Sequence, residues 1–201
     1  RLVKETSSES RQRLHLHALD GLGIAHLERN HLELARACQE EQLRLARTLG
    51  DKTEECLALL RLGTTRSRTG EIDAAATLLQ QAIDLARGSV VPGLEARVWL
   101  AYGWHDEELG RFREAYDDYR RALDLGPNPL NRVDILGGMG NALFALHEIT
   151  DSKRRFDESQ DLAEQMGISS YTAKYQLSLG NLEMEIGEWD VAIGFLQQAR
   201  A

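Results

Sequence analysis

A glycine recurs along the sequence at a nearly constant interval, and this interval restricts the fold more than any other feature does. Each glycine follows Leu, Tyr or Met, and successive glycines are 40, 40, 37 and 40 residues apart. The five positions, called the glycine column below, are Gly23, Gly63, Gly103, Gly140 and Gly180. A period of about 20–50 residues indicates that one supersecondary unit is repeated along the chain.

Further columns repeat in the same register. Seven residues after the glycine column stand Asn30, Gly70, Gly110, His147 and Gly187, of which all but His147 are typical turn residues. Twelve residues after it stand small residues, namely Ala35, Ala75, Ala115, Ser152 and Ala192. Sixteen residues after it stand Gln39, Leu79, Tyr119, Phe156 and Leu196. Because several columns agree, the repeat is real.

Each repeat has the pattern of two helices. The apolar residues of segment 71–87 recur at helical spacing and would share one stripe. A glycine follows each second helix, where a left-handed cap residue is needed: Gly50, Gly88, Gly126 and Gly167. All three prolines, Pro92, Pro127 and Pro129, fall in these junctions, where they interrupt no helix. Leu and Ala dominate the apolar residues, so the sequence predicts an all-α fold.

These features resemble a tetratricopeptide-repeat (TPR) array. Three segments carry the resemblance: "LGTTRSRTGEIDAAATLLQQAIDL" at 62–85, "YGWHDEELGRFREAYDDYRRALDLGP" at 102–127 and "LGNLEMEIGEWDVAIGFLQQA" at 179–199. The resemblance implies an α-α solenoid, a right-handed superhelix of about five helix pairs. A single array over residues 1–201 is expected, with repeats at 12–50, 51–88, 92–126, 129–167 and 168–201.

The spacing of this chain is longer than the period of about 34 residues that the family usually has. In this respect it resembles a subtype found in multidomain bacterial regulators. Because the sequence begins without Met and stops within an amphipathic stretch, we interpret it as a fragment of a longer protein.

The resemblance implies that the first helix of each pair lines a concave groove, which binds a protein or peptide. The predicted lining residues are Leu60, Thr64, Arg68, Leu100, Trp104, Glu108, Asn141, Phe144, Asn181 and Met184. Trp104 is either a hot spot in the groove or a packing residue between helices, and the sequence leaves both open. The lysine–asparagine clamp that some relatives use for C-terminal carboxylates is absent, since neither Asn141 nor Asn181 has a lysine four residues before it.

Polar residues occupy a column where the family often has an aromatic packing residue. Three residues after the glycine column stand His26, Arg66, Asp106, Leu143 and Glu183. We expect the polar groups to be paired between neighbouring repeats, Arg66 with Asp106 above all, because an unpaired buried charge is costly. Arg66 also shares a helix with Arg61 and Arg68, which together form either a solvated face or a patch for an acidic ligand.

Residues 105–108, His-Asp-Glu-Glu, place four potential metal ligands or acid–base groups side by side in the sequence. Successive side chains of a helix point about 100° apart, so only His105 and Glu108 would share a face. Two ligands are too few for a metal site. The carboxylates of segment 113–124, Asp118 among them, are expected to form surface ion pairs with the arginines that follow.

The remaining motif candidates are weak. "HLH" at 15–17 has a spacing that sends its two imidazoles to different helix faces, and "GLG" at 21–23 and "GGMG" at 137–140 follow no strand and lack a phosphate-loop pattern. We therefore expect no catalytic residue, no metal and no cofactor, and we predict that the chain is not an enzyme.

Charge and cysteine usage limit the partners. The net charge of -8 disfavours nucleic acid and anionic membranes, and no apolar run approaches the about 20 residues of a membrane span. Cys38 and Cys56 form no CxxC pair and fit thiols of a reducing, cytoplasmic compartment. The last helix carries Trp189 and Phe195 on an apolar face, which we expect to meet a following repeat or, in a homo-oligomer, another copy.

The leading hypothesis is a non-catalytic protein- or peptide-binding module of a cytoplasmic, bacterial-type regulatory protein, acting as a scaffold in signal transduction or transcription regulation. The alternative is an effector-sensing domain that binds a small molecule or signalling peptide and controls an output domain outside this fragment.

Overall fold

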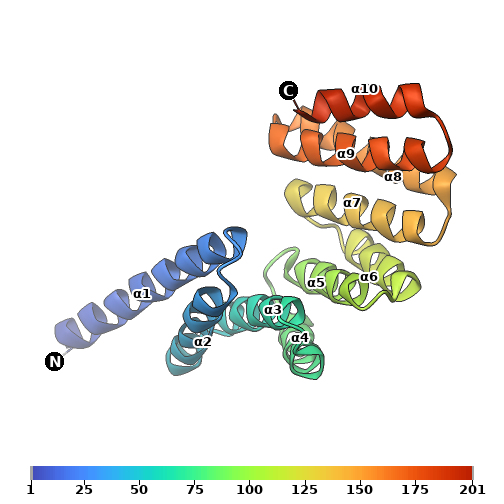
Figure 1. Ribbon diagram of the computed structural model, residues 1–201. Helices are drawn as coiled ribbons and strands as arrows, with labels where there is room; N and C mark the ends of the chain where they lie inside the picture. Colours follow the sequence, from blue (N-terminus) through green and yellow to red (C-terminus); the bar gives the residue numbers. More distant parts are fainter. Residues whose placement is uncertain (1, 201) are drawn as a thin grey trace. The chain divides into compact units, whose positions relative to one another are not determined.

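The computed structural model describes the backbone of residues 2–200 and the side chains of residues 9–168 and 175–199. Within these residues the chain forms ten α-helices and no strand (Figure 1). The helices are α1 (Leu2–Glu28), α2 (Leu32–Leu49), α3 (Lys52–Arg68), α4 (Ile72–Ala86), α5 (Leu94–Glu108), α6 (Phe112–Asp124), α7 (Pro129–Ala145), α8 (Ile149–Gln165), α9 (Ser169–Glu185) and α10 (Trp189–Arg200). The chain divides into two compact units, residues 1–101 and residues 102–201.

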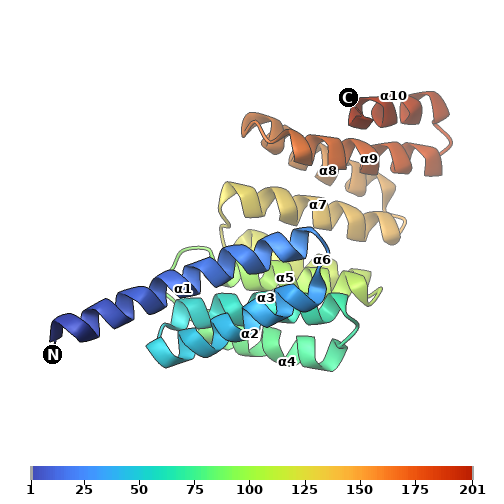
Figure 2. The same ribbon diagram turned by 60° about the vertical axis from the view of Figure 1, so that its left-hand side comes forward.

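Helices that follow one another in the sequence pack against one another. In the first unit α1 contacts α2, α2 contacts α3, and α3 contacts α4. In the second unit the contacts run from α6 to α7, then to α8, α9 and α10, and Figure 2 shows α9 and α10 side by side. The second helices α2, α6 and α8 thus pack on the first helix of the following pair. This arrangement confirms the predicted all-α fold of repeated helix pairs, whereas the single array and its superhelical course stay predictions.

The turn inside every helix pair has the same backbone geometry. The five turns are residues 29–31, 69–71, 109–111, 146–148 and 186–188. The middle residue has a positive φ in each, and for the non-glycine residues Asn30 and His147 it is 59° and 60°. The next N–H closes the turn, as where Glu148 donates to the Leu143 carbonyl at 2.9 Å. His147 therefore adopts the same left-handed conformation as the glycines of the other repeats.

The junctions between helix pairs vary in length, unlike the turns within them. They are residues 50–51, 87–93, 125–128 and 166–168. Each contains a glycine with a positive φ, at 67° in Gly50, 76° in Gly88, 68° in Gly126 and 70° in Gly167. These glycines confirm the predicted left-handed residues after the second helices.

The glycine column is explained by the residue sixteen positions later. A β-carbon on Gly140 would come within 2.6 Å of the Phe156 ring, and one on Gly63 within 3.0 Å of the Leu79 side chain. Two helices of one pair can approach this closely only where one of them has no side chain. At Gly23 the nearest Gln39 atom is 3.6 Å away, so the first pair is less tightly packed at this point.

The small residues of the column twelve positions after the glycine are all buried. In the fourth repeat, where serines replace alanines, the hydroxyls are satisfied by main-chain carbonyls. Ser152 donates to the Gly140 carbonyl and Ser159 to the Val133 carbonyl, each at 2.8 Å. The repeat with the most irregular sequence is therefore packed like the others.

Helix α1 starts well before the first expected repeat. Helix α1 begins at Leu2, whereas the first repeat was expected from residue 12. The helix extends further because residues 2–12 contain no glycine or proline that would end it. No helix among the described residues is long and apolar enough to cross a membrane.

Candidate functional site

Two of the predicted groove residues of the first unit are buried, and the other two make contacts within the unit. Leu60 and Leu100 are buried. The Thr64 hydroxyl donates to the Leu60 carbonyl of its own helix at 3.0 Å. Arg68 is exposed but donates to the Asn30 Oδ1 at 2.8 Å, so its guanidinium is bound to the turn after α1.

The predicted groove residues of the second unit are more open. Trp104 and Glu108 lie at the C-terminal end of α5, Asn141 and Phe144 in α7, and Asn181 and Met184 in α9. Trp104, with 36% of its surface exposed, is open to solvent, as are Glu108 and the two asparagines. Phe144 and Met184 are half-buried, and Phe144 packs against the core.

Helices α7 and α9 contact each other directly, although α8 separates them in the sequence. The Tyr175 ring lies over Gly137, where a β-carbon would come within 2.2 Å of its hydroxyl, and that hydroxyl donates to the Val133 carbonyl at 3.0 Å. Asn141 and Asn181 therefore occupy corresponding positions on two adjacent helices, both exposed. This surface presents two carboxamide groups to solvent.

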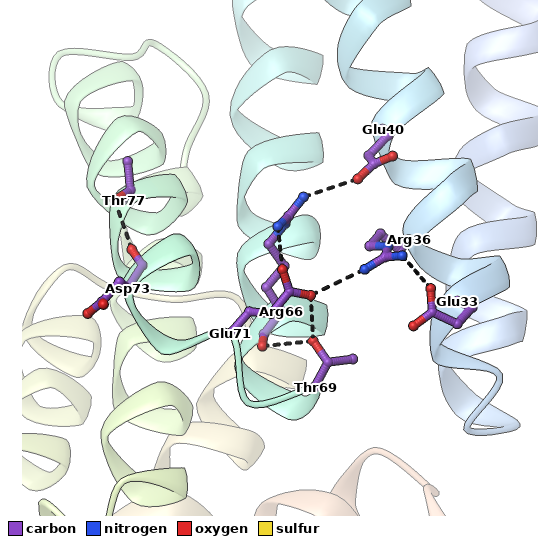
Figure 3. A network of polar contacts seen from close by, with 8 residues as sticks. All are labelled: Glu33, Arg36, Glu40, Arg66, Thr69, Glu71, Asp73 and Thr77. Atoms are coloured by element: carbon purple, nitrogen blue, oxygen red, sulfur yellow. Dashed lines mark hydrogen bonds and ion pairs between the residues drawn. The ribbon is translucent and has the colours of Figure 1, made fainter.

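The three arginines of α3 are bonded to groups of the neighbouring elements. Figure 3 shows Arg66 between the Glu71 and Glu40 carboxylates, at 2.6 Å and 3.2 Å, and Arg36 of α2 also bonded to Glu71 at 3.2 Å. Arg61 pairs with Asp20 of α1, and burial together with the nearby Arg97 lowers the pKa of Arg61 to about 10. Each arginine of the predicted patch thus has a partner inside the first unit.

Arg66 and Asp106, which were expected to pair with each other, each have a partner inside their own unit. Asp106 pairs with Arg111, which stands five residues later, just as Arg66 pairs with Glu71. The second and third repeats therefore carry the same ion pair with its charges exchanged. The structure favours this pair because the closed turn brings positions five residues apart next to each other. In the fifth repeat Glu183 instead pairs with Lys153 of the preceding repeat. This is the pairing between neighbouring repeats that was expected for the polar residues of this column.

The four groups of residues 105–108 lie in different environments. His105 is buried, and burial lowers its pKa. Asp106 pairs with Arg111, Glu107 accepts the Tyr119 hydroxyl at 2.5 Å, and Glu108 is exposed. Among the described residues no group of three or more His, Cys, Asp or Glu side chains could hold a metal ion.

Sequence reasoning missed one unusual carboxylate in α6. Asp118 was expected on the surface but is buried, and it accepts a hydrogen bond from Arg121 at 2.9 Å. Burial, and secondly the charge of Asp106, raise its pKa to about 7. The only sign of this burial in the sequence is that Asp118 directly precedes Tyr119, which belongs to the column sixteen residues after the glycine. A residue next to a fully buried one often lies at the edge of the same helix interface.

Comparisons with known proteins agree with this geometry. A tetratricopeptide-repeat family model matches residues 57–89, and the sequence matches no curated protein. The fold is similar to a Rap protein complexed with competence and sporulation factor, with a TM-score of 0.81 and 12% identity over 96% of this chain and 56% of that chain. It is similar to aspartyl phosphate phosphatase F from Bacillus subtilis, with a TM-score of 0.76 and 10% identity over 98% and 52%. For BtubC from P. vanneervenii the TM-score is 0.72, with 18% identity over 84% and 72%.

At these identities the similarity to solved structures shows the fold alone, and this chain spans about half of the Rap protein and of the phosphatase. The matched segment contains most of α3, the turn at 69–71 and all of α4. The other four pairs repeat its turn geometry. The family model therefore identifies residues 57–89 as a tetratricopeptide repeat, and the chain shares its fold with tetratricopeptide-repeat structures.

Proposed function

We propose that this chain is a non-catalytic module of a cytoplasmic regulatory protein and that it binds a protein or peptide on the exposed face of its first helices. The observation that carries the proposal is a row of three exposed side chains in the second unit. Trp104, Asn141 and Asn181 each stand one residue after the glycine column, on α5, α7 and α9. An exposed Trp and two exposed carboxamides supply apolar area and hydrogen-bonding groups for a main chain.

The predicted groove lining outside this row contributes less to the proposal. Leu60 and Leu100 offer little surface, and Arg68 is already bonded to Asn30. Glu108, Phe144 and Met184 lie beside the row on the same three helices and would form the rim of the contact. We therefore place ligand recognition on the second unit.

Selection of a displayed random-peptide library on the chain, followed by calorimetry, tests the proposal. Trp104→Ala is expected to raise the Kd of the selected peptides by about tenfold or more, and Asn141→Ala or Asn181→Ala by a smaller factor. Trp189→Ala removes a more exposed Trp from α10, outside the row, and should leave the Kd unchanged. Peptides that bind the Trp104 variant as tightly as the unchanged chain would overturn the proposal.

An effector-sensing role is the second candidate function. It is supported by the fold shared with the Rap protein, whose structure was solved with a factor bound. A thermal-shift screen with small metabolites separates the two candidates, because a ligand at a hundredfold excess over its Kd stabilises the folded state by about 2.7 kcal/mol. A metabolite that stabilises the chain where no peptide binds would favour the sensor.

Self-association is a separate proposal, based on the terminal helix. Trp189 and Ile193 of α10 are both exposed and stand four residues apart, so they share one apolar helix face that a second copy of the chain could cover.

A further inference from the structure

Helix α1 exposes the residues that the equivalent helices bury. One residue before the glycine column, Leu22 has 52% of its surface exposed, whereas Leu62 of α3 has 3%. Ala18 and Ala25, five residues before and two residues after the glycine, are exposed as well. The residues at these three positions in α3, α7 and α9 are all buried: Ala58, Leu62, Thr65, Ile135, Met139, Ala142, Tyr175, Leu179 and Leu182.

The buried positions of α3, α7 and α9 form the interface with the preceding second helix. Helix α3 packs on α2, α7 on α6 and α9 on α8. In the α6–α7 interface a β-carbon on Gly138 would come within 2.5 Å of the Tyr119 ring, while the equivalent Gly21 of α1 has nothing within 4 Å. In the α8–α9 interface the Phe156 and Tyr175 rings lie 6.2 Å apart. The exposed face of α1 is thus an unfilled copy of the interface between repeats.

Helix α10 carries the opposite half of that interface. Nine residues after the glycine column, Leu32, Phe112 and Ile149 are half-buried, but Trp189 has 63% of its surface exposed. Thirteen residues after it, Arg36, Tyr116 and Lys153 are half-buried, but Ile193 has 52% exposed. The residues that face the next repeat elsewhere therefore face solvent in α10.

The two ends of the chain also lack the same ion pair. Where the thirteenth position is basic, the next repeat supplies a carboxylate three or eight residues after its glycine: Arg36 pairs with Glu71 and Lys153 with Glu183. In α10 this position is the apolar Ile193. The corresponding two positions of the first repeat are His26 and His31, which carry no carboxylate. The basic residue is therefore missing from the α10 face, and the carboxylate that would pair with it is missing from the first repeat.

We propose that α10 of one copy packs on α1 of another, so that copies stack head to tail through one more repeat interface. Leu196 stands at the position of Tyr119, and Gly21 at the position of Gly138, so Leu196 would lie against Gly21. Trp189 and Ile193 would then lie beside Leu22 and Ala25. The inference rests on the proposed self-association through α10 and is independent of peptide binding. Because the two surfaces differ, the contact does not close on itself and each copy can bind two others.

Two glutamate substitutions test the stacking. Ala25→Glu blocks the α1 face and Ile193→Glu blocks the α10 face, since each would bury an unpaired carboxylate. Ala37→Glu on α2 and Val191→Glu on α10 place the same charge at exposed positions outside the two faces. Sedimentation velocity over a concentration series is expected to show the unchanged chain and both control variants growing in mass, with the two blocked variants monomeric. The blocked contact should weaken by about tenfold or more.

Mixing the two blocked variants gives the decisive result. The Ala25 variant still offers α10, and the Ile193 variant still offers α1, so an equal mixture should form a dimer that grows no further. Misfolding cannot produce this gain of association. An Ala25 variant that associates like the unchanged chain would overturn the α1 contact while leaving self-association through α10. An unchanged chain that is monomeric at every concentration, or a mixture of the two blocked variants that stays monomeric, would also overturn the contact between α10 and α1. This conclusion would hold whatever the peptide measurements on Trp104 show.

Discussion

The ring of Tyr119 fills the space that side chains at two glycines would need. A β-carbon would come within 2.2 Å of this ring at Gly103 and within 2.5 Å at Gly138. Tyr119 is fully buried, and its hydroxyl donates to Glu107. One aromatic side chain of α6 therefore sets how closely α5 and α7 approach that helix.

Gly103→Ala should lower the free energy of unfolding by about 1–3 kcal/mol, because the added methyl group forces the Tyr119 ring to move. Gly21→Ala is the matched control, since a β-carbon there meets nothing within 4 Å. In α1 the change should stabilise the chain by about 0.5–1 kcal/mol through helix propensity alone. Urea unfolding of both variants measures the difference, and equal effects at the two sites would contradict the packing argument.

His147→Gly should stabilise the chain by about 0.5–1 kcal/mol, because His147 holds the left-handed conformation with a β-carbon present. Asn30→Gly at the equivalent turn should change stability less, since asparagine tolerates this conformation better. Gly110→Ala should destabilise. Thermal unfolding compares the three variants, and a destabilised His147 variant would show that the imidazole contributes more than the strain costs.

Asp118→Asn should stabilise the chain above neutral pH. The pKa of Asp118 is about 7 in the folded chain, above the about 3.9 of an unfolded aspartate, so the folded state binds the proton more tightly. Stability then falls as the pH rises from about 4 to about 7 and levels off above it. The asparagine variant lacks this fall and should gain roughly 1–3 kcal/mol at pH 8, with little gain at pH 4.5.

Chemical denaturation at several pH values measures this dependence. Asp124→Asn, at an exposed position of the same helix, is the control and should show no such change between pH 4.5 and pH 8. If the Asp118 variant gained the same stability at both pH values, its carboxyl group would not be the titrating group.

Exchanging Arg66 and Glu71 by Arg66→Glu and Glu71→Arg should cost about 0.5–1 kcal/mol at low salt. The exchanged pair would still attract, but each new charge would face its own kind at Glu40 or Arg36. The cost is modest because these groups are partly exposed, and it should shrink in 1 M salt. Exchanging Glu41 and Arg44, an exposed pair within α2, should cost less. Equal costs for the two exchanges would argue against the network of Figure 3.

The column alignment predicted the parts of the fold that depend on local chemistry. Glycine or asparagine at a turn and glycine after a second helix each follow from the backbone conformation of one residue, and the structure places them as expected. The sequence also predicted that residues 105–108 would not converge, because helical spacing alone decides that. The residue that each glycine of the column packs against was not predicted, since the partner ring or side chain lies sixteen residues away on another helix.

The partners of polar groups could not be predicted in the same way. Arg66 was paired with Asp106 because both stand in one column, but the closed turn offers a nearer partner to each. Asp118 was placed on the surface because its neighbours are charged, although burial of Tyr119 carries it inward. The groove lining was taken from the family, and which of its residues bind a ligand stays a prediction for the Trp104 and asparagine variants to test.

The five turns within helix pairs are uniform, whereas the four junctions between pairs differ in length. A change in length is therefore easier to accommodate between repeats than inside them. The junction at 87–93 is the longest of the four, and Val90 at its tip is almost fully exposed. A loop, an epitope or a protease site introduced at Val90 should leave the helices on both sides intact, which makes this junction the natural place to cut the chain or to add to it.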